Sequence, residues 1–161
     1  VYIHTGLYKA RPEVNSVIHI HPPRVVIFTI CEKEFLPLYG AYDPSSVYLL
    51  LEGIPTYGRS ITISNEELSK EFCAAMGQKN VCLMRGHGIT TAGATVEEAT
   101  MTAIKVNELA EMSYQAHLLG DPKPIPDEDI EHFKKSLAKR AGKPSPHATA
   151  GWRYYEKLSG A

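Results

Sequence analysis

A six-residue run at positions 16–21, Ser-Val-Ile-His-Ile-His, constrains the fold of this chain more than any other segment. Its β-branched residues and its alternation are typical of a strand with one buried face. The run ends at Pro22 and Pro23, which lack the backbone N–H group that a strand ladder needs. A second short apolar run, Val81–Met84, is typical of a buried strand. The chain is therefore expected to contain strands.

Helical spacing and capping signals surround these strands. Apolar residues at every third or fourth position predict a helix over residues 1–10. Two Ser/Thr-x-x-Glu motifs, at 64–67 and 95–98, have the spacing of a capping box. They predict helices that end near Met76 and at Gly120, the second being the longest helix of the chain. Strands that alternate with helices indicate an α/β or α+β domain.

Other segments are less decisive. Residues 24–31 fit a strand by their β-branched content, whereas the prolines ahead of them fit the opening of a helix. Residues 39–63 are broken by Gly and Pro and are expected to form loops with one or two short strands. Residues 127–141 predict a charged, solvated helix, and residues 143–161 an extended tail. With no internal repeat, residues 1–161 are interpreted as one domain.

Composition excludes several classes of function. Seventeen Lys and Arg residues against 18 Asp and Glu residues give a formal net charge of −1. This balance lacks the basic excess of nucleic-acid-binding proteins and of polybasic membrane patches. The longest apolar runs are too short to cross a bilayer, and the first residues lack the pattern of a signal peptide. Cys31, Cys73 and Cys82 form no Cys-x-x-Cys pair and are expected to be reduced thiols of a cytoplasmic protein.

Three histidines form the most informative pattern. His19 and His21 are two residues apart on the expected strand, so their side chains project from the same face, about 6.6–6.8 Å apart along the chain. His87 lies between Gly86 and Gly88, just past the expected strand Val81–Met84, where glycines allow a sharp turn. Three imidazoles suit Zn²⁺ first and then Mn²⁺, Co²⁺ or Fe²⁺, with a coordination position left for a substrate. The alternative is that the His-x-His pair is incidental.

Two motifs resemble those of the class II aldolase/adducin family. The run LYKARPEVNSVIHIHP at 7–22 is similar to the first motif of that family, and LMRGHGI at 83–89 to the second. Glu-Glu-Ala at 97–99 opens the helix that follows the second motif. The resemblance extends from residue 1 to about residue 121. It implies a three-layer α/β fold in which a central, mostly antiparallel sheet is flanked by helices.

The resemblance also implies a site and a mechanism. His19, His21 and His87 match the three histidines that hold a catalytic Zn²⁺ in the family. There the metal binds two adjacent oxygens of the substrate and stabilises the enediolate left when a carbon–carbon bond breaks. The family's acid/base glutamate falls immediately before Val1, and its phosphate-binding loops lie further upstream. We therefore expect this chain to be the C-terminal portion of the domain, and a homotetramer with active sites between subunits.

The resemblance orders the candidate activities of a metal-dependent carbon–carbon lyase. Residues 36–43 are weakly similar to the branch that decarboxylates hydroxylated aromatic acids, so decarboxylation of a hydroxy-aromatic or oxo acid ranks first. Aldol cleavage of a small sugar or sugar phosphate ranks second, and 4-epimerisation third. The alternative of another class is a non-catalytic, adducin-like interaction module. The presence of all three histidines argues against that module, because a scaffold does not need them.

Several further residues have two interpretations each. Arg85 is a candidate for binding a substrate carboxylate, or a structural partner of another carboxylate. Tyr39 and Tyr42 are candidates for donating a proton to a leaving group, or packing residues. Tyr155, or its neighbour Tyr154, is a candidate for reaching an active site, in relatives that of the neighbouring subunit, or packs in the tail. The remaining histidines lack partner spacing and are interpreted as helix-surface or loop residues: His4, His117, His132 and His147.

Overall fold

The computed structural model describes residues 1–140 and 146–160 and contains one four-stranded sheet with the order β1-β4-β3-β2. β1 (Ser16–Ile20) and β3 (Val81–Met84) both pair antiparallel with β4 (Gly88–Gly93). The two-residue β2 (Thr56–Tyr57) pairs parallel with β3 at the far edge. The prediction of a mostly antiparallel sheet is therefore confirmed. In the register of β1 and β4, His19 lies opposite Thr90.

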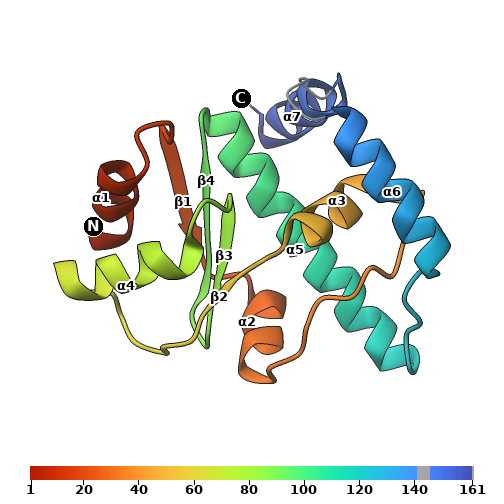
Figure 1. Cartoon of the computed structure of the whole chain (residues 1–161), viewed down its shortest axis with the longest axis horizontal. Coiled ribbons are helices and arrows are strands. Elements are labelled where there is room, and N and C mark those ends of the chain that lie inside the picture. Colours follow the sequence, from red (N-terminus) through yellow and green to blue (C-terminus); the bar gives the residue numbers. More distant parts are fainter. Residues whose placement is uncertain (141–145, 161) are drawn as a thin grey trace.

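Helices cover both faces of this sheet (Figure 1). One face is covered by α1 (Tyr2–Ala10) and α4 (Glu66–Met76). The other is covered by α2 (Pro23–Ile30) and the long α5 (Val96–Leu119). The outer helices pack on these: α3 (Pro44–Glu52) on α5 and α6 (Asp127–Arg140), and α7 (Pro146–Ser159) on α5. This arrangement confirms the three-layer α/β fold.

Two apolar cores lie on opposite faces of the sheet, and β1 contributes to both. Val17 packs with Ile3 and Leu7 in the core beneath α1 and α4. Ile18 packs against the core that α2 and α5 cover, which includes Val106. Odd-numbered residues of β1 therefore face α1, and even-numbered residues face α5, as the two-residue period of a strand requires. This alternation decides on which side of the sheet the histidines lie.

Two segments between residues 22 and 53 are helical. For the first segment the sequence left the choice between strand and helix open, and for the second it predicted loops. Residues 24–30 belong to α2, which begins at Pro23, where the missing N–H group costs nothing. Within 39–63, which was expected to hold only loops and short strands, α3 was missed. The Asp43 carboxylate accepts a hydrogen bond from the Ser45 N–H at 3.1 Å, which caps α3. The short strand expected in that region is present as β2.

The capping signals were largely correct. Thr95 caps α5 by accepting the N–H of Glu98 at 3.2 Å, and α5 ends before Gly120 as predicted, with 24 residues the longest helix described. At α4 the predicted cap is wrong by one residue. Asn65, and not Ser64, accepts the Leu68 N–H, at 2.9 Å, because Asn65 is the residue with extended backbone next to the helix.

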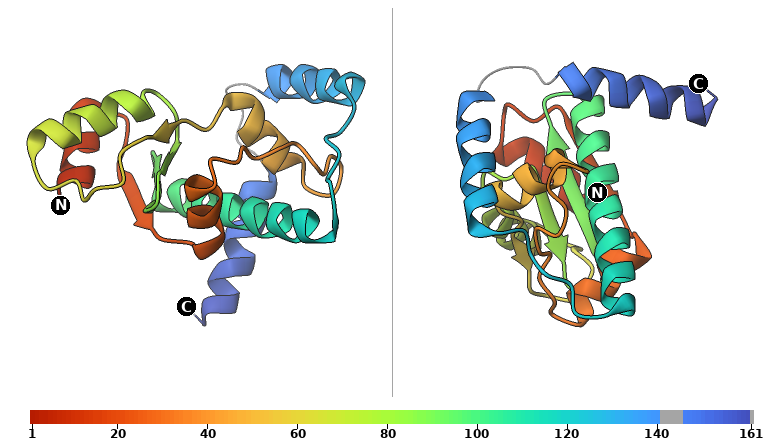
Figure 2. Two further views of the ribbon diagram at one scale, coloured as in Figure 1. Left: turned by 90° about the horizontal axis from the view of Figure 1, so that it is seen from below. Right: turned by 90° about the vertical axis from the view of Figure 1, so that its right-hand side faces the viewer.

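The C-terminal part differs from the expected extended tail, because residues 146–159 form α7. Figure 2 shows α7 meeting α5 near one end of that helix and then projecting from the body of the protein. Tyr154 and Leu158 of α7 are exposed. α6 confirms the charged helix expected at 127–141. Among the described residues, no helix is both long enough and apolar enough to span a bilayer.

Candidate metal centre

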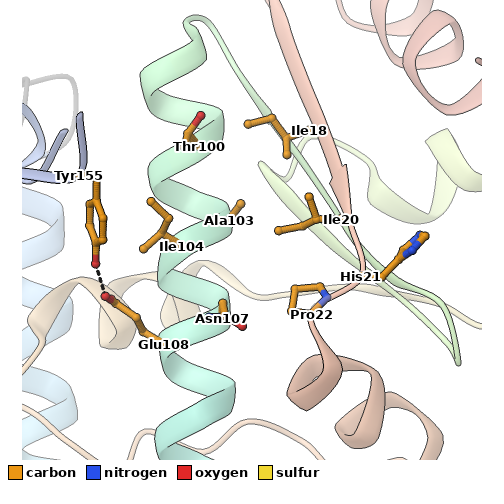
Figure 3. Close-up of a pocket in the computed structure, with 10 residues that line it drawn as sticks. All are labelled: Ile18, Ile20, His21, Pro22, Thr100, Ala103, Ile104, Asn107, Glu108 and Tyr155. Atoms are coloured by element: carbon orange, nitrogen blue, oxygen red, sulfur yellow. Dashed lines mark hydrogen bonds between the residues drawn. The ribbon is translucent and has the colours of Figure 1, made fainter. Parts of the chain in front are cut away.

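β1 presents two of the three candidate ligands on one face of the sheet. His19 has the same parity as Val17, so its side chain lies on the α1 face. His21 follows the strand directly and keeps this direction. Figure 3 shows its ring pointing away from α5, whereas Ile18 and Ile20 point toward α5.

A tight turn between β3 and β4 brings the third histidine to the end of β1. The His87 N–H donates to the Met84 carbonyl at 3.0 Å, and Gly86 adopts φ +60°, a conformation that side chains with a Cβ disfavour. At Gly88 a Cβ atom would lie 2.2 Å from the Ile20 carbonyl oxygen, so only glycine allows the two strand ends to approach this closely. Glycine on both sides of His87 is therefore explained by the backbone conformation at Gly86 and by the close approach of the strand ends at Gly88.

The three imidazole rings surround one point. Each pair of ring centroids is 4.8 Å apart. The Nε2 atom of His19 lies 3.0 Å from Nε2 of His21 and 3.3 Å from Nε2 of His87. A tetrahedral ion bound at the usual Zn–N distance separates its nitrogen ligands by about 3.3–3.4 Å. The arrangement of the three nitrogens therefore fits a divalent metal ion, and within the described ranges no other cluster of three metal-binding side chains was found.

The second nitrogen of His19 is held by the sheet. Nδ1 lies 3.0 Å from the carbonyl oxygen of Ile89 and 3.1 Å from Oγ1 of Thr90. Because a carbonyl oxygen only accepts, Nδ1 carries the proton and donates it to Ile89, which leaves the Nε2 lone pair for a metal. The sequence did not reveal Thr90 as part of the site. Its contact with His19 follows from the register of β1 and β4, which no local sequence signal specifies.

The surroundings of His19 and His87 favour their neutral imidazole forms. Burial, followed by the neighbouring His87 and His21, lowers the pKa of His19 to about 4. Burial, followed by His21, also lowers the pKa of His87. Each neutral ring keeps a nitrogen lone pair, which is the form that binds a metal ion. Nδ1 of His87 is buried and has no hydrogen-bond partner in the part of the chain that the structure describes.

The tyrosine candidates lie on the α5 side of the sheet, away from the face that carries the histidines. Tyr155 lines a groove of ≈ 670 Å³ between β1, α5 and α7, and its hydroxyl donates a hydrogen bond to Glu108 (Figure 3). Tyr39 and Tyr42 form an edge-to-face pair, with centroids 5.9 Å apart, and line a cavity of ≈ 510 Å³ beside α5. His21 lines the same groove as Tyr155, whereas the cavity that Tyr39 and Tyr42 line has no histidine in its lining. The catalytic roles of the three tyrosines stay predictions.

Arg85 lies next to the turn that carries His87 but is engaged elsewhere. Its guanidinium forms an ion pair with Glu32 at 2.5 Å, and its backbone N–H donates to the Tyr57 carbonyl at 3.0 Å. Both side chains of this ion pair are partly exposed, so a competing carboxylate can reach the guanidinium at modest cost. The structural interpretation of Arg85 therefore has a named partner, and its substrate-binding role stays a prediction.

The fold and the site together define an α/β domain with a three-histidine centre at the end of one strand. Residues 1–114 match the Class II Aldolase and Adducin N-terminal domain. The chain therefore belongs to the class II aldolase/adducin family, as the two motifs indicated.

Two relatives and one solved structure show the range of the family. A 3,4-dihydroxyphthalate decarboxylase from Arthrobacter keyseri is 40% identical over 129 residues, which are 80% of this chain and 52% of the relative. A 5-methylthioribulose-1-phosphate/5-deoxyribulose-1-phosphate aldolase from Rhodospirillum rubrum is 28% identical and covers 90% of this chain and 65% of the relative. The crystal structure of an aldolase II superfamily protein from Pseudomonas syringae has a TM-score of 0.80 at 20% identity, covering 98% of this chain and 60% of that chain. The chain spans about half the length of the decarboxylase it matches.

Proposed function

We propose that this protein is a metal-dependent carbon–carbon lyase whose reaction is the decarboxylation of a hydroxy-aromatic acid. The observation that carries the proposal is the convergence of His19, His21 and His87 on one point. The 40% identity to a 3,4-dihydroxyphthalate decarboxylase supports the choice of reaction. In such a reaction the bond between a ring carbon and a carboxyl carbon breaks, CO₂ leaves, and a proton takes its place on the ring.

The residues of the chain supply the binding and the orientation. The three histidines hold a divalent metal ion, Zn²⁺ by preference and Mn²⁺, Co²⁺ or Fe²⁺ as alternatives. When bound, the ion acts as a Lewis acid toward substrate oxygens and stabilises negative charge in the transition state. The hydrogen bond from Nδ1 of His19 to the Ile89 carbonyl fixes the ring and its tautomer. Three protein ligands would leave the ion a further coordination position for a substrate, and His21 is exposed to solvent.

The proposal extends to the assembly and to Arg85. The family resemblance supports a cytoplasmic homotetramer with the active site between subunits, in which Tyr39, Tyr42 or Tyr155 serves a partner's site. Arg85 is proposed to exchange Glu32 for a carboxylate of the substrate. A bidentate pair between the guanidinium and that carboxylate would be at least as strong as the ion pair with Glu32. In that role Arg85→Lys should raise KM for a dicarboxylic acid more than it lowers kcat.

Metal content and CO₂ release test the proposal. The purified chain is expected to bind one Zn²⁺, and His19→Ala to lose it, whereas the control His132→Ala, on the distant α6, keeps it. The Zn²⁺-loaded protein is then given 3,4-dihydroxyphthalate, and released CO₂ is measured against a chelator-treated sample. A chain that binds no divalent metal, or that binds it equally well without His19, would contradict the proposal.

Aldol cleavage of a sugar phosphate is the second candidate, because the aldolase from Rhodospirillum rubrum matches 90% of this chain. Release of an aldehyde from 5-deoxyribulose-1-phosphate, without CO₂ release from hydroxy-aromatic acids, would select this reaction. The 4-epimerase reaction ranks third. A non-catalytic, adducin-like role is disfavoured because three imidazoles surround one point, an arrangement that a scaffold does not need.

A further inference from the structure

Helix α1 packs on β1, the strand that carries His19, and one hydrogen bond fixes the position of the helix relative to the strand. The Tyr8 hydroxyl accepts the backbone N–H of Val17 at 3.2 Å. On the same helix, Ile3 and Leu7 are buried in the core that also contains Val17. α1 therefore rests on the face of β1 from which His19 projects.

The geometry of a helix and an antiparallel strand places His4 beside His19. α1 and β1 run in opposite directions, as Figure 1 shows. His4 is one turn before Tyr8 on the same stripe of α1, which is about 5.4 Å along the helix axis. A strand advances about 3.3 Å per residue, so the same distance leads from Val17 roughly two residues on, to His19.

The electrostatics of the site agree with this placement. The charge of His4 acts on His19 and contributes to lowering the pKa of His19, after the larger effects of burial, His87 and His21. His4 is half-buried, and burial is the main cause of its own lowered pKa. His4 lies on helix α1 with a partly exposed side chain, as the interpretation of a helix-surface histidine expects. His4 is not a fourth ligand, because it does not belong to the group whose ligand atoms lie within 4.8 Å of one another.

We propose that His4 is a fourth histidine of the metal centre, outside the ligand set, whose imidazole donates a hydrogen bond to the anion that occupies the open coordination position. Neutral imidazole has one N–H donor, and a half-buried donor stabilises a charged acceptor more than a solvated one does. In the proposed decarboxylation the acceptor is a carboxylate or phenolate oxygen of the substrate, and to that extent the inference rests on the proposed function. His4 thus orients the substrate on the side of the site that α1 forms.

Anion binding to the metal-loaded protein tests this role without requiring turnover. The full chain is loaded with Co²⁺, and azide is titrated while the visible absorption of the ion is followed. We expect His4→Phe to bind Co²⁺ as the wild type does and to bind azide about tenfold more weakly, because one hydrogen bond to a charged group is lost. His4→Gln, whose amide nitrogen can replace the donor, should recover most of the affinity. The exposed-residue control His132→Phe should leave both affinities unchanged.

A second measurement uses the unmodified protein. In the Zn²⁺-loaded wild type, the ring ¹⁵N–¹H signals of His4 should shift when azide is added, whereas those of His132 should not. The inference is overturned if the azide affinity of His4→Phe stays within twofold of the wild type, if the His4 signals do not respond, or if the wild type binds no azide. It is also overturned if His4→Phe or His4→Gln loses Co²⁺ while remaining folded, because His4 would then be a ligand.

The inference and the proposed function can fail separately. If azide binding depends on His4 but the wild type releases no CO₂ from 3,4-dihydroxyphthalate, the inference stands and the decarboxylase proposal fails. If the wild type and His4→Phe release CO₂ at equal rates with equal KM, and azide binding is also equal, the decarboxylase proposal stands and the inference fails.

Discussion

At the scale of single residues, the sequence revealed the three candidate ligands but not the groups that hold them. His19, His21 and His87 could be predicted because spacing along a strand and flanking glycines are local features. Thr90 could not, because its contact with His19 depends on the pairing of two strands that are far apart in the sequence. The role proposed for His4 was not indicated by the sequence for the same reason, since the position of His4 follows from the packing of α1 on β1.

Replacing Thr90 tests how much the support of His19 contributes. Thr90→Val removes the hydroxyl that lies 3.1 Å from Nδ1 of His19, and we expect about tenfold weaker Zn²⁺ binding. The matched control is Thr91→Val, one residue along β4. Thr91 is equally buried, but its hydroxyl donates to the Ala99 carbonyl at 2.8 Å, on the α5 side. Thr91→Val should lower the free energy of unfolding and leave the Zn²⁺ affinity intact, and equal loss of affinity in both variants would contradict this account.

Gly88 offers a steric test of the close approach between β4 and β1. In Gly88→Ala the new Cβ would lie 2.2 Å from the Ile20 carbonyl and 2.9 Å from Cδ2 of His21, so the strand end carrying His21 must move. We expect a loss of stability of about 1–3 kcal/mol and markedly weaker Zn²⁺ binding. Gly58→Ala is the control, because a Cβ at Gly58 meets nothing within 4 Å. Urea unfolding and Zn²⁺ titration of both variants provide the comparison. Wild-type Zn²⁺ affinity in Gly88→Ala would refute the claim that the close approach at Gly88 positions His21.

At the scale of elements, strong local signals were reliable and weak ones were not. The Thr95 cap and Gly120 correctly bounded α5, because capping depends only on residues within one turn. The nine-residue α3 was missed because nearby Gly and Pro residues suggested loops, although Asp43-Pro44 is a good helix start. β4 was not predicted either, since its Gly-Ile-Thr-Thr-Ala-Gly sequence becomes a strand only between β1 and β3.

Two neighbouring residues, Ser64 and Asn65, are candidates for the N-cap of α4, and their alanine variants distinguish between them. Asn65→Ala removes the side-chain oxygen that accepts the Leu68 N–H and should destabilise the protein by about 1 kcal/mol. Ser64→Ala, at the position that the capping-box spacing favoured, should change the free energy of unfolding by less than about 0.5 kcal/mol. Denaturant unfolding of the two variants measures the difference. A larger effect of Ser64→Ala than of Asn65→Ala would show that the helix begins one residue earlier.

At the scale of the whole molecule, the metal centre and the outer helices lie on different sides of the sheet. The histidines lie on the face that α1 and α4 cover, whereas α7 is fastened to α5 on the other face. Part of that attachment is the hydrogen bond from the Tyr155 hydroxyl to Glu108, a carboxylate that also pairs with Lys105 at 2.7 Å. High pH weakens the attachment of α7, because it ionises the phenol of Tyr155.

The hydrogen bond to Glu108, followed by burial, raises the pKa of Tyr155 to about 12, above the ordinary value of about 10 that the unfolded chain has. The folded state therefore holds this proton more tightly, so its contribution to stability is complete below pH 10 and is lost as the pH rises through 12. In Tyr155→Phe this contribution is absent, so the free energy of unfolding should fall less steeply with pH between pH 10 and 12. The two slopes, of the variant and of the wild type, should differ by the amount that corresponds to about one proton released on unfolding. The control Tyr154→Phe removes a neighbouring phenol that is 62% exposed and should keep the wild-type slope. Urea unfolding at several pH values in this window measures the slopes, and identical slopes in the two variants would show that the Tyr155 proton is not linked to folding.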